Sequence, residues 1–310
     1  MKVLLVGGCG FIGSHVVDRL LTAGMSVRVF DRRPEPFRPP VEKVDYSFGD
    51  MRDTSLVYEA AADVDAIIHM ASMTVPTTAN LDPVEDVTGN LISMLRLLAA
   101  LRDRPLRKFV FLSSGGTVYG IPESVPIMET HPLRPINSYG IVKVAIENYL
   151  HMEQHLHGLP SLVLRASNPY GPRQGHAGVQ GVIGTHLWRI AQNQPTEIWG
   201  DGSVVRDFIH VRDLAALCCD ALLSDLTGCF NAGSGQGASI SEVVAEIGSV
   251  VRASGFAEVK PTHKPGRNYD VPRVVLDISK AKKLLGWEPQ IDLAEGLEET
   301  WTWVLSQVTD

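Results

Sequence analysis

The chain has 310 residues, of which 45% are hydrophobic and 20% are charged. This composition is typical of a folded globular protein and excludes disorder, collagen and coiled coil as descriptions of the whole chain. The 28 basic and 35 acidic side chains give a net charge of −7, and because a phosphate-backbone binder needs clustered Lys and Arg, we expect no nucleic-acid partner. No apolar run reaches the roughly 18 residues of a membrane span, and the first residues do not resemble a signal peptide. We therefore expect no membrane partner and a cytoplasmic protein.

The cysteine pattern argues against both disulfides and metal. The four cysteines, Cys9, Cys218, Cys219 and Cys229, include an adjacent pair but no C-x-x-C. Neither a disulfide framework nor a zinc site has this spacing. We expect reduced cysteines that pack in the core, and no bound metal.

Short apolar runs alternate with helical patterns in the first half of the chain, which predicts an α/β protein with a doubly wound parallel sheet of the Rossmann type. Strands are expected at 3–6, 27–30, 44–48, 66–70, 109–112 and 162–164, and helices at 14–23, 84–101 and 137–157. Gly and Pro are frequent from Asn168 onward, which predicts a smaller, loop-rich lobe over the carboxyl edge of the sheet. We expect a Rossmann domain over residues 1–167 and a substrate lobe over residues 168–310, with some later segments returning to the first domain.

Three glycines lie between the first expected strand and the first expected helix, namely Gly7, Gly10 and Gly13 in VLLVGGCGFIG. They permit a tight turn and let a pyrophosphate approach the free N–H groups of the helix N-terminus. Asp31 ends the second strand about 20 residues further on, where a carboxylate accepts hydrogen bonds from an adenine ribose. The combination predicts a dinucleotide site.

The same region bears on the choice of cofactor. Asp31 would repel a 2′-phosphate and so favours NAD over NADP, although Arg32 and Arg33 partly offset that repulsion. Asp50, in FGDMRD, could accept from the adenine amine or cap the next helix. The fourth strand ends in the small residues of HMAS, which leave room for a cofactor, and its His69 is expected to be a satisfied core histidine.

Tyr139 and Lys143 are four residues apart in SYGIVK, inside the expected helix at 137–157. This spacing places both side chains on one face of a helix. A nearby ammonium and the positive nicotinamide of an oxidised cofactor would lower the phenol pKa from its usual value of about 10. Tyr139 then becomes a general base, an interpretation that depends on the dinucleotide pattern upstream because Y-x-x-x-K alone is common.

With these motifs the chain resembles the extended short-chain dehydrogenase/reductase superfamily, and within it the NAD-dependent nucleotide-sugar epimerases and dehydratases. The resemblance covers nearly the whole length, through GGCGFIG, FGDMRD, HMAS, SSGGTVYG, SYGIVK, RASNPYGP, WGDGSVVRDFIHVRDLA and DISKAKKLLGWEP. It implies that NAD is lined by Phe11, Ile12, Asp31, Asp50, Met51, Met70, Ala71, Ser72 and Asn90, with Tyr139 and Lys143 catalytic. It also implies that a nucleoside diphosphate is held by Asn168, Arg206, Arg267 and Asp270, and two arginines suit a pyrophosphate because their forked donors neutralise it.

One position departs from the family pattern. The usual catalytic Ser or Thr falls on Gly115, which has no hydroxyl, so Ser114 and Thr117 are the candidates to replace it. We favour Thr117, because similar epimerases keep a Thr there. The 4,6-dehydratases have Asp-Glu where this chain has Gly116 and Thr117, and the uronic-acid decarboxylases keep a Glu at the second of these positions, so both reactions are disfavoured.

The resemblance therefore implies an NAD-dependent UDP-hexose 4-epimerase acting on UDP-glucose and UDP-galactose through a transient 4-keto sugar. A nucleotide-sugar reductase or dehydrogenase is the alternative, and Gly115 alone suggests a non-catalytic NAD-binding protein. By the same resemblance Val274 stands beside the sugar C2 substituent, where a small side chain would admit N-acetyl sugars; the alternative is that Val274 begins a strand and faces the core. A homodimer through the helices near 84–101 and 138–157 is also implied, with a monomer as the alternative.

Overall fold

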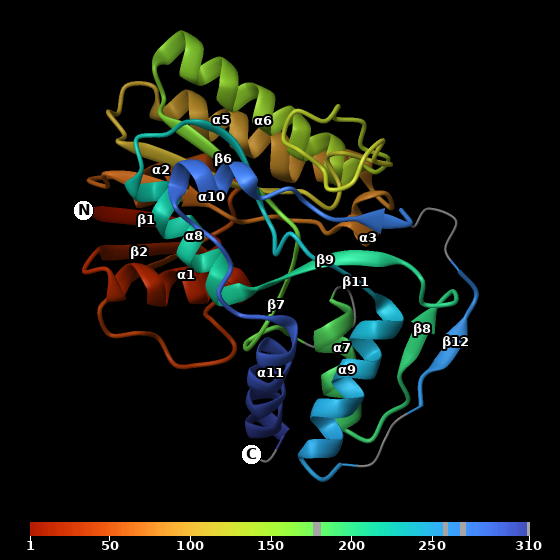
Figure 1. Ribbon diagram of the computed structural model, residues 1–310. Coiled ribbons are helices and arrows are strands. Elements are labelled where there is room, and N and C mark those ends of the chain that lie inside the picture. The colour runs from red at the N-terminus through yellow and green to blue at the C-terminus, as the bar shows by residue number, and fades with distance from the viewer. Residues whose placement is uncertain (176–180, 257–259, 267–270, 309–310) are drawn as a thin grey trace.

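A seven-stranded parallel sheet forms the centre of the computed structural model, which describes residues 1–175, 181–256, 260–266 and 271–308 (Figure 1). The strand order is β10-β6-β5-β4-β1-β2-β3, so the order reverses direction between β1 and β4. The strands are β1 (Lys2–Val6), β2 (Ser26–Asp31), β3 (Val44–Phe48), β4 (Ala66–His69), β5 (Lys108–Ser114), β6 (Ser161–Ala166) and β10 (Gly228–Ala232). The predicted doubly wound Rossmann-type sheet is confirmed, and its reversal point is where such sheets bind ligands.

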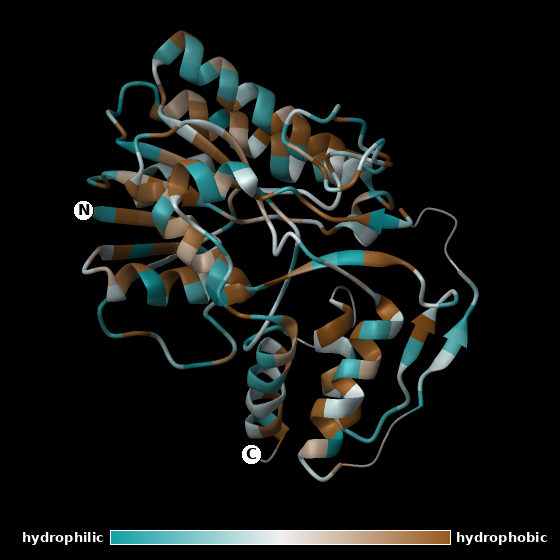
Figure 2. Cartoon of the chain, viewed as in Figure 1, coloured by the Kyte–Doolittle hydropathy of each residue, from teal (hydrophilic) through white to brown (hydrophobic). Residues whose placement is uncertain are grey.

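Helices cover both faces of this sheet. The helices are α1 (Phe11–Thr22) and α8 (Val211–Leu223) on one face, and α2 (Thr54–Ala60), α5 (Ser93–Leu101) and α6 (Ser138–His157) on the other. Val3 and Leu5 of β1 pack in the cluster with α1 and α8, whereas Leu4 and Val6 pack in the cluster with α2, α5 and α6. Because successive side chains point to opposite faces, a strand buried on both faces has a continuous apolar run, and β1 is mostly brown in Figure 2.

The helix expected at 84–101 is divided into three parts. It begins as the short α4 (Pro83–Asp86), continues as a π-helical stretch (Val87–Ile92), and ends as α5. A π-helical turn is rare and shifts the register of the side chains around it. Asn90 lies within this turn, so its direction could not be derived from a 3.6-residue period.

The second half of the chain contains more helix than its glycine and proline content indicated. Its further elements are β7 (Asn168–Tyr170), α7 (Val182–Ala191), β8 (Glu197–Trp199), β9 (Val205–His210), β11 (Gly237–Ser239), α9 (Ile240–Ala253), β12 (Thr262–Lys264), β13 (Arg273–Val274), α10 (Ser279–Leu285) and α11 (Leu293–Val308). Helices α7, α9 and α11 pack on one another around the buried Trp301. From this half, α8 and β10 return to the large sheet, while β9 pairs with β7, β11 and β13 below its carboxyl edge.

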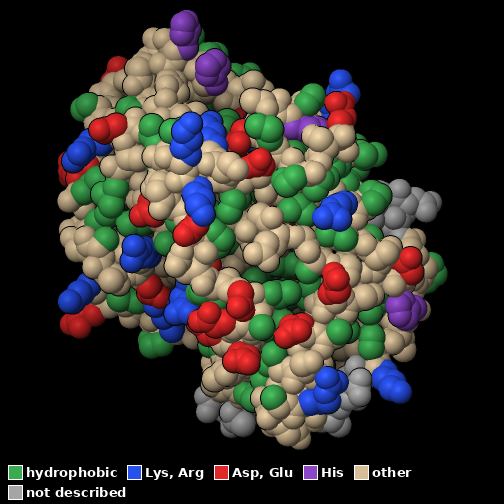
Figure 3. Space-filling view, viewed as in Figure 1, with side chains coloured by type: hydrophobic (Ala, Val, Ile, Leu, Met, Phe, Trp, Pro, Cys, Tyr) green, Lys and Arg blue, Asp and Glu red, His purple; other side chains and the backbone are tan. Residues whose placement is uncertain are grey.

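The face of the molecule shown in Figure 3 carries mixed charge. On this face acidic and basic side chains are interspersed among apolar and neutral ones. Among the described helices, none combines the length and the apolar character needed to cross a bilayer.

The glycine turn gives a test of how this fold is held together. A Cβ at Gly13 would lie 2.2 Å from the Gly7 carbonyl oxygen and 2.7 Å from the Gly8 Cα, whereas a Cβ at Gly10 would meet only the Gly7 oxygen, at 3.4 Å. Gly13→Ala should therefore push α1 away from β1 and lower the free energy of unfolding by roughly 1–3 kcal/mol, the usual cost of overpacking.

Urea denaturation of Gly13→Ala and of the matched control Gly10→Ala measures this difference. The control changes an exposed N-cap position and should cost roughly 1 kcal/mol or less. Equal stabilities of the two variants would contradict the close packing of α1 on the glycine turn.

Candidate active site

A cleft of about 370 Å³ lies at the carboxyl ends of β1, β2 and β4. It brings together most of the residues that the sequence assigned to the cofactor: Gly7, Gly10, Phe11, Ile12, Gly13, Asp31, Arg32, Met51, Met70, Ala71, Ser72 and Tyr139. Asn90 and Lys143 line a smaller cavity that adjoins it and shares Met51, Ala71, Ser72 and Tyr139 with it. The cleft therefore leads directly to the Tyr139–Lys143 pair.

The entrance of this cleft fits a dinucleotide. The first turn of α1 contains no acidic residue, so its free N–H groups are open to an anion. Gly7 lies so close to the segment after β4 that a Cβ there would be 2.7 Å from the Ala71 nitrogen. Asp31 is fixed at the edge of the turn, where its carboxylate accepts from the N–H of Cys9 (2.9 Å) and of Arg32 (2.7 Å). These residues would hold the pyrophosphate and the adenine ribose of NAD.

Asp50 does not cap a helix, so that interpretation was wrong. The N-cap of α2 is Asp53, which accepts from the N–H of Ser55 at 3.1 Å, because a cap must directly precede the first helical residue. Asp50 instead forms a salt bridge with Arg52 (2.8 Å), and hydrogen bonding from Arg52 lowers its carboxyl pKa. Its contact with an adenine amine stays a prediction.

Tyr139 is placed by the first turn of α6. The side chain of Asn137 caps this helix by accepting from the N–H of Gly140 (2.7 Å). A Cβ at Gly140 would lie 2.8 Å from the carbonyl oxygen of Thr117, so only glycine lets the helix approach the turn after β5 this closely. Tyr139 is thereby brought next to the segment that carries the candidate hydroxyls.

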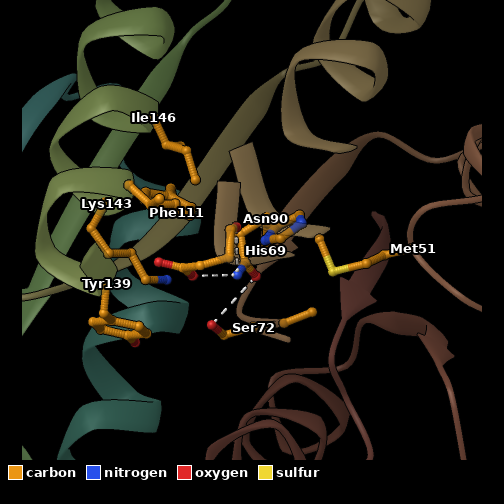
Figure 4. A pocket seen from close by; sticks show the side chains of 11 residues that line it. Met51, His69, Ser72, Asn90, Phe111, Tyr139, Lys143 and Ile146 are labelled. Atoms are coloured by element: carbon orange, nitrogen blue, oxygen red, sulfur yellow. Dashed lines mark hydrogen bonds between the residues drawn. The ribbon is translucent and has the colours of Figure 1, made fainter. Parts of the chain in front are cut away.

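Lys143 lies one helical turn further along the same face. It is buried, its Nζ donates to the Leu112 carbonyl oxygen (2.9 Å), and it is 5.4 Å from the centre of the Tyr139 ring. Both side chains extend from α6 toward a pocket whose other side carries Ser72 and Asn90 (Figure 4). The predicted common face is observed.

Burial dominates the electrostatics of this pair. It raises the pKa of Tyr139 to about 12, while a hydrogen bond with Ser72 acts in the opposite direction. Burial also lowers the pKa of Lys143 to about 8, opposed by the negative charges of Glu147 and Asp86. At neutral pH the lysine is therefore charged and the phenol is protonated. A base role for Tyr139 needs further positive charge beside the ring, which an oxidised nicotinamide brings.

The helix is anchored by a buried ion pair that the sequence did not reveal. Glu147 accepts from the hydroxyl of Ser113 on β5 (2.5 Å) and forms a salt bridge with Arg165 on β6 (2.6 Å). The side chains of this pair are only 4% and 5% exposed. Glu147 follows Lys143 by four residues, so that spacing was the available signal.

His69 is buried, but it is not satisfied as expected. It is 2% exposed, and its Nδ1 has no hydrogen-bond partner among the described residues. Burial, together with the charge of Lys143, lowers its pKa to about 3, so the ring is neutral at physiological pH. It packs against Phe109 and Phe111 at the edge of the small cavity.

Gly115 is required by its packing. A Cβ there would lie 2.6 Å from Cδ1 of Leu276 and 2.9 Å from the carbonyl oxygen of Arg165, and the φ angle of Gly115 is not positive. Leu276 is fixed in turn, because its N–H donates to the buried carboxylate of Asp207 (3.2 Å). The side chain of Leu276 occupies the space into which a serine at position 115 would project.

The two candidate hydroxyls lie in the turn that follows β5. Thr117 and Ser114 are both partly exposed, and the Thr117 Oγ1 donates to the Ser114 carbonyl oxygen over 3.5 Å. Thr117 packs against the first turn of α6 through its backbone, as described above. This contact involves the Thr117 carbonyl and not its hydroxyl, so the choice between Thr117 and Ser114 stays a prediction.

The residues expected at the substrate diphosphate converge on β9. Asn168 lies on β7 and donates to the Asp207 carbonyl oxygen (2.8 Å), whereas Arg206 lies on β9 and donates to the Val271 carbonyl oxygen (2.6 Å). Because β7 pairs with β9, the two residues belong to one small sheet. Arg267 and Asp270 lie outside the described residues.

The structure places Val274 in the core, contrary to the expectation that it lines the sugar site. Its side chain is 2% exposed and packs in a cluster of apolar residues, which are Val118, Tyr119, Ile127 and Leu276. Val274 lies on β13, in register with Arg206 of β9, and the pleat turns its side chain inward. The alternative interpretation, a strand residue facing the core, fits this position.

Comparison with known proteins agrees with this geometry. Residues 3–233 match the model of the NAD dependent epimerase/dehydratase family. The chain belongs to this family.

Family members with assigned activities are similar to the chain over its whole length. The UDP-glucose 4-epimerase of Mycolicibacterium smegmatis is 36% identical over 97% of this chain and 97% of its own. The crystal structure of UDP-glucose 4-epimerase with UDP-glucose from Thermotoga maritima superimposes with a TM-score of 0.92 at 33% identity, covering 99% of this chain and 100% of that one. The Thermus thermophilus UDP-glucose 4-epimerase complex with NAD gives a TM-score of 0.89 at 35% identity, covering 98% and 99%. In the present chain, the described residues include no cluster of three or more His, Cys, Asp or Glu side chains that could hold a metal ion.

The packing of Gly115 gives the prediction for this site. Gly115→Ser restores the family hydroxyl, but it should lower stability by roughly 1–3 kcal/mol because the new Cβ overlaps Leu276 and the Arg165 carbonyl. Leu276→Ala alone should cost roughly 2–5 kcal/mol through the cavity it leaves.

A double-mutant cycle measured by urea denaturation tests whether the two positions interact. The double variant Gly115→Ser/Leu276→Ala should be more stable than the sum of the single changes predicts, since each relieves part of the other's defect. Simple additivity would show that Leu276 does not exclude a side chain at position 115.

Proposed function

We propose that the protein is an NAD-dependent UDP-hexose 4-epimerase that interconverts UDP-glucose and UDP-galactose. The observation that carries the proposal is the placement of Tyr139 and the buried Lys143 on one face of α6, next to a cleft that fits NAD. The similarity of the whole chain to UDP-glucose 4-epimerases supports the same reaction and substrate class.

The chain's own residues supply binding and proton transfer. The glycine turn and Asp31 would hold NAD, and the bound cofactor would supply a reversible hydride acceptor, so that a ketone formed at sugar C4 could be reduced again on its opposite face. Tyr139 would remove the proton of the 4-hydroxyl and later return it. The charged ammonium of Lys143 would stabilise the phenolate of Tyr139. Thr117 would hold the reacting oxygen by a hydrogen bond, and Arg206 with Asn168 would bind the diphosphate end. The reaction needs no net oxidation, so bound NAD is not consumed.

The side chains before the V-Y-G turn support epimerisation over elimination. A 4,6-dehydration needs an acid and a base near C5 and C6, but Gly116 and Thr117 provide no carboxylate. A net reductase would convert reduced cofactor to oxidised cofactor with every turnover. An epimerase would not, so a measurement of cofactor consumption distinguishes the two. A non-catalytic NAD-binding protein would have no need of a tyrosine next to a buried lysine on the same helix face.

Mass spectrometry and a coupled assay test the proposal directly. The purified protein should carry NAD and should interconvert UDP-glucose and UDP-galactose without added nucleotide. Assay of UDP-GlcNAc and UDP-GalNAc in parallel would determine the breadth toward N-acetyl sugars. Stoichiometric consumption of NAD(P)H would support the reductase instead.

Tyr139→Phe removes the phenol oxygen and should lower kcat about 100-fold or more, the scale of a lost general base. Because the ring remains, bound NAD and the unfolding midpoint should stay near the values of the unmodified protein. The assay is UDP-galactose formation at saturating UDP-glucose. A folded variant that retains its rate would remove Tyr139 from the mechanism.

We also propose that the protein acts as a cytoplasmic homodimer through α5 and α6. Ile141, Tyr149 and Leu156 are 55%, 37% and 61% exposed, and their spacing puts them on one face of α6. Burial of such an apolar stripe against a second copy is a usual source of dimer stability.

Leu156→Asp should therefore weaken the dimer, because a carboxylate would be desolvated in the interface. Light scattering after size exclusion measures the mass. Leu223→Asp is the matched control, since Leu223 is 59% exposed at the end of α8, away from this face. A monomeric unmodified protein, or equal behaviour of both variants, would contradict the proposed interface.

A further inference from the structure

A buried carboxylate next to the catalytic pair has so far no role. Asp86 is the last residue of α4 and is 0% exposed. It lines the small cavity together with Tyr139, Lys143, Asn90 and Ser72. A carboxylate is rarely buried completely unless it is held by several donors.

The partners of Asp86 come from three separate segments. Its Oδ1 accepts from the Thr74 hydroxyl (2.5 Å) and from the Asn90 amide (2.9 Å). Its Oδ2 accepts from the Ser138 hydroxyl (2.6 Å). All three donors are neutral, so Asp86 brings a negative charge into the site while its hydrogen-bonding capacity is used by the loop after β4, the π-helical turn and the start of α6.

The bond to Ser138 bears directly on catalysis, because Ser138 precedes Tyr139. The Ser138 N–H also donates to the side chain of Asn80 (2.9 Å), which caps the end of the short helix α3 (Pro76–Ala79), so two bonds tie the first turn of α6 to the wall opposite. That wall carries Ser72 and Thr74, which line the cofactor cleft. The distance between the phenol and the cofactor end of the cleft is thereby fixed through Asp86.

The charge of Asp86 also acts on the pair. It raises the pKa of Lys143 against the effect of burial, and it raises the pKa of Tyr139. The other groups that face the pair are Glu147 from α6, which is paired with Arg165, and His69 from β4, which is neutral because its pKa is about 3. Asp86 is thus a negative group beside Lys143 that has no cation of its own among its hydrogen-bond partners.

We propose that Asp86 is a positioning residue for the reaction: it fixes the Tyr139-bearing turn of α6 against the loop after β4 and supplies the negative charge opposite Lys143. This proposal rests on the epimerase function proposed above. The hydrogen bonds from Asn90 in the π-helical turn and from Thr74 would then serve to hold the Asp86 carboxylate in place.

Two variants separate the charge from the geometry. Asp86→Asn keeps the shape and can still accept from Thr74 and donate to Ser138, but it removes the charge. Ser138→Ala removes one bond to α6 and keeps the charge. Asp82→Asn is the control, because it makes the same charge change at an exposed position four residues away that only caps α4.

We expect Asp86→Asn to lower kcat about 10-fold with KM within about 2-fold, a small misplacement of reacting groups being enough for such a loss. Removal of the negative charge lowers the pKa of both Lys143 and Tyr139, so both limbs of the kcat–pH profile should move to lower pH. Ser138→Ala should lower kcat without moving the profile. The control variant Asp82→Asn should match the unmodified enzyme in kcat and in the kcat–pH profile.

An NMR titration of 13C-labelled lysine side chains, with NAD added, gives a readout that does not need turnover. The Lys143 signal, assigned by its loss in Lys143→Met, should titrate at lower pH in Asp86→Asn than in Asp82→Asn. Unchanged Lys143 titration together with unchanged kcat in Asp86→Asn would overturn the proposal, as would full activity of Ser138→Ala. Absence of UDP-glucose turnover by the unmodified protein would instead overturn the proposed function, and the lysine titration would still test the charge of Asp86.

Discussion

The close packing of α6 on β5 is the constraint on which the site depends. Three contacts hold the helix there: Glu147 on Ser113, Lys143 on the Leu112 carbonyl, and the side-chain-free Gly140 against the Thr117 carbonyl. Each joins α6 to the strand or to the turn that follows it. If the helix moved outward, the phenol would leave the edge of the sheet where the cleft opens.

One helix face serves both stability and chemistry. Tyr139, Lys143 and Glu147 are spaced by four residues, so they form a row from the cleft into the interior. The two buried charges in this row, on Lys143 and Glu147, are stabilised by different partners. Glu147 has a salt bridge with Arg165, whereas Lys143 has a carbonyl oxygen and the nearby carboxylates. These buried charges therefore act strongly on the pKa of the Tyr139 phenol, because burial reduces screening by water.

The second half of the chain packs against the end of β5. Asp207 holds the N–H groups of Ser234 (2.7 Å) and Leu276, and Leu276 in turn lies against Gly115 at the end of β5. A residue late in the chain thus restricts which side chain can stand at position 115, at the end of β5. The packed side chain of Leu276 thus leaves no room for the Cβ of a serine at position 115.

The sequence by itself determined the features that are local. The glycine turn and Asp31 lie within one βαβ unit, and Tyr139 and Lys143 lie within one helical turn, so strand and helix periodicity are enough to bring each set together. Only the tertiary structure decided the rest. Asp86 contacts Ser138, which is 52 positions further along the chain, and Leu276 packs against Gly115 from a distant part of the sequence, so no spacing indicates either contact. The burial of Val274 and the π-helical turn at Asn90 were likewise set by neighbouring elements, because the direction of a side chain there depends on strand pairing and helix register rather than on the residues alongside it.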